Sequence, residues 1–198
     1  MNDTKEQILN TALGLFAESG FEAVSVSDIA GRLDMTKGAL YKHFKNKQDI
    51  FDSILSRMER LYSPEYFLSV SCHDEPESSA NVSPVLKAVL NWCVSCFSFW
   101  TEDKFASPFR KMLTLEQYRN DEMNRLYCRY LVSSPVERLA ELIRSFGANG
   151  AAEKAFSLYS AIYFSFAVYD AAPDKMCTHF VLKESIERMC FDIFEKNV

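Results

Sequence analysis

Apolar residues recur at helical spacing along most of the chain. Between Thr4 and Ser19 they fall at positions 8, 9, 12, 13, 15 and 16, the stripe of an amphipathic helix, and Gly20 ends that segment. Similar patterns predict further helices over residues 48–61, 85–102, 105–117, 121–146, 151–171 and 175–196, with a break or kink in 121–146 at Pro135. No segment alternates as a half-buried strand does, so the pattern predicts an all-α fold.

Two shorter helices are expected between the first helix and residue 48. Ser25 and Asp28 have the spacing of a capping box, which starts a helix that runs to Leu33. After a tight connection, Thr36 is the expected N-cap of a second helix that runs to Phe44. Two short helices joined in this way are typical of a helix-turn-helix, whose second helix enters the major groove of DNA.

The side chains of the second short helix suit contact with DNA. Lys37 lies at its N-terminus, Gly38 lets the backbone approach closely, and the Ala39 methyl matches a thymine methyl. Tyr41 and Lys42 fall on the side expected to be exposed, opposite the inward positions 40 and 44. A capped helix pair with a solvated lysine face is the alternative. It gives no reason for a glycine inside a short helix, which costs about 1 kcal/mol relative to alanine.

The net charge of the chain does not decide between these alternatives. The formal charge is -5 and the pI about 5.3, whereas nucleic-acid-binding surfaces are usually basic. Residues 35–48, however, carry four lysines and His43 and no acidic residue. A small basic surface on an acidic body therefore remains consistent with DNA binding.

Residues 8–51, ILNTALGLFAESGFEAVSVSDIAGRLDMTKGALYKHFKNKQDIF, strongly resemble the DNA-binding signature of the TetR family of bacterial transcriptional regulators. The resemblance implies a helix-turn-helix domain over 1–47, followed over 48–198 by a larger helical domain for ligand binding and dimerisation, with 48–61 as a linking helix. It also implies contacts with DNA phosphates or the major groove by Ser25, Ser27, Thr36, Lys37, Gly38, Ala39, Tyr41, Lys42, His43 and Lys47. Ser27 departs from the many family members that have a basic residue there.

The part of the chain after residue 84 is rich in aromatic residues. If it holds a ligand cavity, as the resemblance implies, the expected lining is Trp92, Cys96, Trp100, Phe109, Met112, Tyr127 and Tyr130. Such a cavity would prefer a flat or apolar molecule, with Glu102, Arg110 or Glu116 as inward-facing polar groups. Ordinary core packing explains the same aromatic residues equally well.

The other chemistry in the sequence is sparse. Cys93 and Cys96 form a CxxC on a helix, for which core packing is the leading interpretation and a redox role stays open. A metal site would need further ligands at matching spacing, and none is expected. Nothing indicates a catalytic triad or a phosphate-binding loop, so we expect neither an enzyme nor a cofactor. The absence of a signal peptide or membrane span predicts a cytoplasmic protein.

The last two predicted helices carry apolar residues on more than one side. One side can pack on the body and another against a second subunit, which predicts a homodimer. The function expected from the whole sequence is a repressor released from a palindromic DNA operator by a small, largely apolar or aromatic ligand. The alternative is a regulator, or a DNA-bound interaction platform, that is controlled by a protein partner or by no small ligand.

Overall fold

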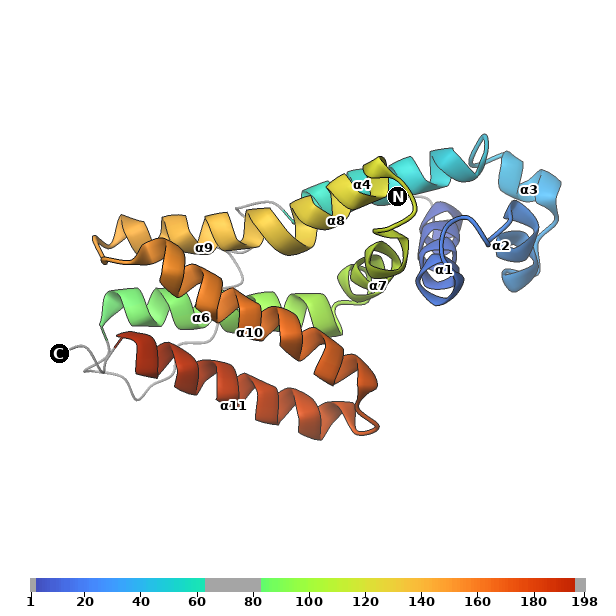
Figure 1. Ribbon diagram of the computed structural model, residues 1–198. Helices are drawn as coiled ribbons and strands as arrows, with labels where there is room; N and C mark the ends of the chain where they lie inside the picture. The colour runs from blue at the N-terminus through green and yellow to red at the C-terminus, as the bar shows by residue number, and fades with distance from the viewer. Residues whose placement is uncertain (1–2, 63–82, 195–198) are drawn as a thin grey trace. The chain divides into compact units, whose positions relative to one another are not determined.

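The computed structural model describes residues 3–62 and 83–194, and every regular element among them is helical (Figure 1). The all-α prediction is confirmed. The stretch between the predicted helices 48–61 and 85–102 lies, apart from residues 62, 83 and 84, outside this described part. The described residues of 1–63 and 104–127 form one compact unit, unit 1, and those of 64–103 and 128–198 form unit 2. The predicted division into a DNA-binding domain over 1–47 and a ligand-binding and dimerisation domain over 48–198 stays a prediction.

Unit 1 forms around helix α1 (Asp3–Ser19), whose apolar stripe is buried. Helix α1 packs against α2 (Val26–Arg32), α4 (Lys47–Leu61) and α7 (Ala106–Glu116). The unit also contains α3 (Lys37–Tyr41) and all but the last residue of α8 (Asp121–Cys128). Ring contacts of 5.1 and 4.9 Å between centroids join Phe21 to Phe16 and to Phe51. A helix from the middle of the chain thus completes the core of the N-terminal helices.

The local signals that end helices in unit 1 act largely as predicted. Gly20 ends α1 with a φ of +85°, a conformation that other residues rarely adopt. Helix α3, however, ends at Tyr41 and not at Phe44 as predicted. The His43 N–H bonds to the Leu40 carbonyl, three residues back, and this tighter turn ends the α-helix.

Unit 2 packs four long helices against one another (Figure 1): α6 (Pro84–Glu102), α9 (Ser134–Ser145), α10 (Ala151–Ala171) and α11 (Lys175–Phe194). Ser83 caps α6 and Pro84 occupies its first turn, where the missing N–H costs no helical bond. Helix α10 contacts α6, α9 and α11, and Phe166 of α10 stacks on Phe97 of α6 with centroids 6.4 Å apart. Aromatic side chains therefore make much of this core.

The helix predicted over 121–146 with a break at Pro135 is divided into three parts. A five-residue π-helical segment, η1 (Arg129–Ser133), separates α8 from α9. Proline has no N–H with which to bond the carbonyl four residues earlier, here that of Leu131. The buried Tyr159 hydroxyl of α10 donates to that Leu131 carbonyl over 2.9 Å. A side chain from another helix thus bonds the carbonyl that Pro135 cannot reach.

Substitution of Tyr159 by Phe tests this bond. The variant leaves a buried carbonyl without its hydroxyl partner, so we expect the free energy of unfolding to fall by about 1–3 kcal/mol. Urea unfolding at a fixed protein concentration measures the change. Tyr118→Phe, at a side chain that is 88% exposed, is the matched control and should change stability by less than about 0.5 kcal/mol. Equal unfolding midpoints for Tyr159→Phe and wild type would contradict the assignment.

Candidate nucleic-acid interface

Helix α2 begins with the predicted capping box. The Ser25 backbone N–H and hydroxyl both donate to the Asp28 carboxylate at 2.7 Å, and the Asp28 N–H donates back to the Ser25 hydroxyl oxygen at 3.2 Å. These bonds hold the pKa of the exposed Asp28 carboxyl below its ordinary value, and the Ser25 hydroxyl contributes most. The box fixes the start of α2 and leaves both side chains exposed.

The connection between α2 and α3 is a Schellman turn. Asp34 takes a left-handed φ of 52°, its N–H bonds to the Gly31 carbonyl, and the Met35 N–H bonds to the Ala30 carbonyl. Thr36 then caps α3, because its hydroxyl oxygen accepts from the Ala39 N–H at 3.2 Å. The two short helices are therefore joined as the capping signals predicted.

Helix α3 has a buried side and an exposed side. Leu40 is fully buried and Phe44, just beyond the helix, is also buried. Lys37, Tyr41 and Lys42 are exposed, with Tyr41 at 50% of its full area. The residues predicted to contact DNA that are exposed are Ser25, Thr36, Lys37, Gly38, Tyr41 and Lys42, and those that are half-buried are Ser27, Ala39, His43 and Lys47.

Lys47, predicted to reach a phosphate, also has partners within the protein. Its ammonium donates to the carbonyl of Phe21 over 2.7 Å and to that of Glu22 over 3.3 Å, and it lies 4.3 Å from the centre of the Phe21 ring. An ammonium has three N–H donors, so these bonds leave one for another acceptor. The lysine therefore joins the start of α4 to the turn that follows α1.

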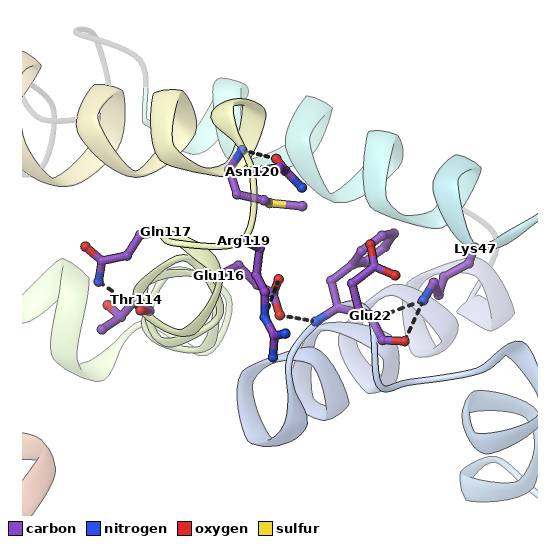
Figure 2. Close-up of polar contacts among 9 residues, drawn as sticks. Glu22, Lys47, Thr114, Glu116, Gln117, Arg119 and Asn120 are labelled. Atoms are coloured by element: carbon purple, nitrogen blue, oxygen red, sulfur yellow. Dashed lines mark hydrogen bonds and ion pairs between the residues drawn. The ribbon is translucent and has the colours of Figure 1, made fainter.

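Glu116, at the end of α7, contacts the same turn. Its side chain is 2% exposed, and its Oε1 accepts from the Phe21 N–H at 3.0 Å. Figure 2 shows Glu116 and Lys47 approaching the turn from opposite sides. The sequence indicated Glu116 as an inward-facing polar group, but nothing in it pointed to a partner 95 residues away. Arg110 is buried as well, whereas the Glu102 side chain is 51% exposed.

Arg57 makes a second polar connection in unit 1. Its guanidinium forms an ion pair with Glu6 of α1 and lies 4.1 Å from the centre of the Phe105 ring, beside the first turn of α7. Both charged side chains are about three-quarters buried. Arg57 therefore holds α4 to α1 and to the start of α7, as Glu116 holds the end of α7 to the turn after α1.

The residues predicted to line a ligand cavity are divided between the two units. Phe109, Met112 and Tyr127 belong to unit 1, and Trp92, Cys96, Trp100 and Tyr130 belong to unit 2. All of them are buried except Trp92, which is half-buried and meets the Tyr159 ring edge-on at 6.4 Å. Trp100, Phe109 and Met112 have no exposed area, which is what close core packing produces.

The cysteines of α6 lie in the core of unit 2. Burial raises the pKa of the Cys93 and Cys96 thiols, and a hydrogen bond with Cys190 raises that of Cys93 further. Reactive cysteines are thiolates in partly exposed positions, so the structure favours the packing role over the redox role. Among the described residues, no cluster of His, Cys, Asp and Glu has the arrangement of a metal site.

His179 of α11 is the one place where a serine, a histidine and an acid meet in the described part of unit 2. The Ser98 hydroxyl lies 3.2 Å and a Glu102 carboxylate oxygen 3.3 Å from the same ring nitrogen, Nε2. In a catalytic triad the nucleophile and the acid bond to different ring nitrogens. The cluster is therefore a polar contact between α6 and α11, and it lacks the geometry of a catalytic triad.

The helices of the described residues are all too short or too polar to span a membrane.

Comparison with protein families gives a match over residues 8–54 to the bacterial regulatory proteins of the tetR family. The transcriptional regulator YerO of Bacillus subtilis is 37% identical over 71 residues, which cover 36% of this chain and 22% of that protein. The regulator AcrR of Shigella flexneri is 42% identical over 52 residues, covering 26% and 24%. The transcriptional repressor BepR of Brucella suis is 38% identical over 74 residues, covering 37% and 35%. The matched region spans only 22–35% of the length of these relatives.

Solved structures resemble the chain over nearly its full length. A transcriptional regulator from Aquifex aeolicus has a TM-score of 0.67 at 16% identity, covering 94% of this chain and 99% of that one. The fatty acid degradation regulator FadR from Bacillus halodurans has a TM-score of 0.66 at 16% identity and covers 98% of each chain. At this identity the likeness shows the fold alone, an N-terminal helix-turn-helix followed by a helical body.

The capping box makes a pH-dependent contribution to stability. Because the folded-state pKa of Asp28 is lowered, its contribution is fully present above the unfolded pKa, about 3.9, and is lost as the pH falls through the lower folded value. We therefore expect Asp28→Asn to destabilise the protein at pH 7 and to approach wild type as the pH falls below about 4. Urea unfolding across this range measures it, with Glu22→Gln as the control for loss of an exposed charge. A stability difference that stays constant with pH would contradict the expectation.

Proposed function

Because the chain belongs to the TetR family of bacterial regulatory proteins, we propose that it is a dimeric transcription regulator that binds an operator DNA through α2 and α3. The observation that carries this proposal is the exposed side of α3. It presents Lys37, Tyr41 and Lys42 together, on a helix whose opposite side is buried. The family consists of regulators, so we propose no enzymatic activity. A regulator that binds chromosomal DNA would be located in the cytoplasm.

The proposed interface divides the contacts by their chemistry. Lys37, Gly38, Ala39 and Tyr41 read the major groove from α3, since base edges carry the sequence information. Side chains flanking α3 fix the register by binding phosphates, among them Lys47, whose ammonium keeps one donor beyond its two carbonyl partners. The phosphate and groove contacts proposed from the family signature also include Ser25, Ser27, Thr36, Lys42 and His43.

We propose α10 and α11 as the dimer interface. These helices pack against each other and still expose large apolar side chains: Phe156, Tyr163, Phe164, Val168, Met176, Phe180, Val181 and Phe191. Several large apolar side chains exposed on two neighbouring helices are typical of a protein interface. Two copies of the helix pair would form an isologous four-helix contact, which would place two copies of α3 on one palindromic operator.

The proposed mode of control is release of the operator when a small apolar or aromatic ligand binds to the body. Repression as the direction is supported by the name of one relative, the repressor BepR. The alternative is control by a protein partner or by no small ligand. It is favoured by one observation: Trp100, Phe109 and Met112 have no exposed area. Release of operator DNA by a small molecule, with no other protein present, separates the two alternatives.

Substitutions on the exposed side of α3 test DNA binding. We expect Lys37→Ala and Tyr41→Ala each to weaken binding to an inverted repeat upstream of the gene by about 5- to 150-fold, the value of a good base contact. Both side chains are exposed, so melting temperatures should not change. Fluorescence anisotropy with labelled DNA measures the affinity. Lys104→Ala removes an exposed lysine outside the interface and should bind as wild type does. Wild-type affinity in both α3 variants would remove the assignment.

Charged substitutions on α10 and α11 test the dimer. Phe164 and Phe180 are 69% and 61% exposed in the single chain. Each substitution occurs twice in an isologous interface, so a cost of about 2 kcal/mol per copy raises the dimer dissociation constant by roughly 10³. We therefore expect Phe164→Glu and Phe180→Glu to be monomeric at micromolar concentration in analytical ultracentrifugation. Leu115→Glu, also at an exposed apolar residue, is the control and should stay dimeric. Dimers in both α10 and α11 variants would place the interface elsewhere.

A further inference from the structure

The turn after α1 is bound by groups of opposite charge from two other helices. The Phe21 N–H donates to Glu116 of α7, and the Phe21 carbonyl accepts from Lys47 of α4 (Figure 2). Lys47 also reaches the Glu22 carbonyl. Both peptide groups of Phe21 are thus held in place, and its ring packs against Phe16 and Phe51.

Burial of the Glu116 carboxylate costs free energy, and the packing of α7 alone does not require a charged side chain there. A buried charge is expensive unless it is paired and fully hydrogen-bonded. Oε1 has the Phe21 N–H, whereas Oε2 has no hydrogen-bond partner among the described residues and lies 3.9 Å from the Nε of the mostly exposed Arg119. An apolar side chain would fill the same place at lower cost. The best explanation of the carboxylate is therefore its hydrogen bond with the Phe21 N–H in the turn.

Gly20 shows how closely this carboxylate approaches the backbone. A Cβ built on Gly20 would lie 2.3 Å from Glu116 Oε1, and the residue's φ of +85° already disfavours a side chain. The turn is thus shaped both to reverse the chain and to admit the carboxylate. An acceptor at this point fixes the direction of the Phe21 N–H, and with it the direction of the next peptide group.

The position of Phe21 affects two parts of the proposed DNA interface, the start of α2 and the Lys47 ammonium. Four residues further along the chain, Ser25 begins α2 and its capping box. From the other direction, the Phe21 and Glu22 carbonyls orient the Lys47 ammonium, one of the groups proposed to bind phosphate. A shift of this turn would displace both the start of α2 and the lysine.

We infer that Glu116 is a positioning residue for DNA binding, which acts on the operator contacts by fixing the backbone of Phe21. This inference rests on the proposed function. Glu116 acts through a backbone N–H and Lys47 through the adjacent carbonyl. The two residues therefore act on the same turn, and loss of either should reduce the effect of losing the other.

The test compares two substitutions of similar size in the full-length dimer. Glu116→Gln keeps an oxygen that accepts from the Phe21 N–H, whereas Glu116→Met removes every acceptor. We expect Glu116→Gln to bind the inverted repeat within about threefold of wild type, and Glu116→Met to bind it about tenfold more weakly. Binding is measured by anisotropy at a temperature at which each variant's own melting curve shows it folded. Glu122→Gln, at an exposed carboxylate, controls for the loss of charge.

A double-mutant cycle shows whether the effect passes through the turn. In a Lys47→Met background, we expect Glu116→Met to weaken binding by no more than about threefold, because the turn is already released. Additive losses, or wild-type affinity of Glu116→Met, would overturn the inference. If Glu116→Met does not fold, Glu116→Asp replaces it, since the shorter side chain withdraws the carboxylate from the N–H, and the same loss is expected. Failure of the wild-type protein to bind any operator would instead count against the proposed function.

Discussion

The reversal of the chain at Gly20 and Phe21 is the constraint on which the N-terminal unit depends. Gly20 takes a left-handed conformation that ends α1, and the carboxylate of Glu116 occupies the space that a side chain at Gly20 would need. Phe21 then turns inward between Phe16 and Phe51, while its two peptide groups bind α7 and α4. Chain reversal, core packing and the ties between helices are therefore made by the same two residues.

The short helices depend on this frame because they are too short to be stable alone. Helices α2 and α3 have seven and five residues, well below the roughly 12–15 that an isolated helix needs in water. Each cap side chain accepts from one free N–H in the first turn of its helix, and the buried Ile29 and Leu40 hold the two helices on the core. The exposed side chains of α3 do not take part in this packing, so they are available to bind a partner.

The sequence predicted features whose signals are local. The capping box at Ser25, the cap at Thr36 and the stop at Gly20 depend on residues within four positions of each other, and all appear where expected. Pro135 predicted a break, but the π-helical segment lies before it, and no local pattern indicates the Tyr159 hydroxyl that bonds its Leu131 carbonyl.

The features that the sequence missed depend on distant partners. The Glu116 bond spans 95 residues, and the carbonyl partners of Lys47 lie on a turn 25 and 26 residues earlier. The aromatic residues predicted as a cavity lining were chosen by composition; they belong to two compact units, and the lining stays a prediction. Composition reports that such side chains are buried, whereas which of them share a site is set by tertiary packing.

The ties in unit 1 limit how it can respond to an effector. Helix α7 is fixed at its start by Arg57, which also pairs with Glu6, and at its end by Glu116. Allosteric coupling is typically about 1–3 kcal/mol, whereas a single hydrogen bond to a charged group is worth about 1.5–3 kcal/mol and leaves a buried charge when broken. An effector of ordinary coupling energy cannot break both ties. In a ligand-controlled regulator of this build, α1, α4 and α7 would therefore move together as one body, and the response would be a displacement of the whole DNA-binding unit and not a local unfolding within it.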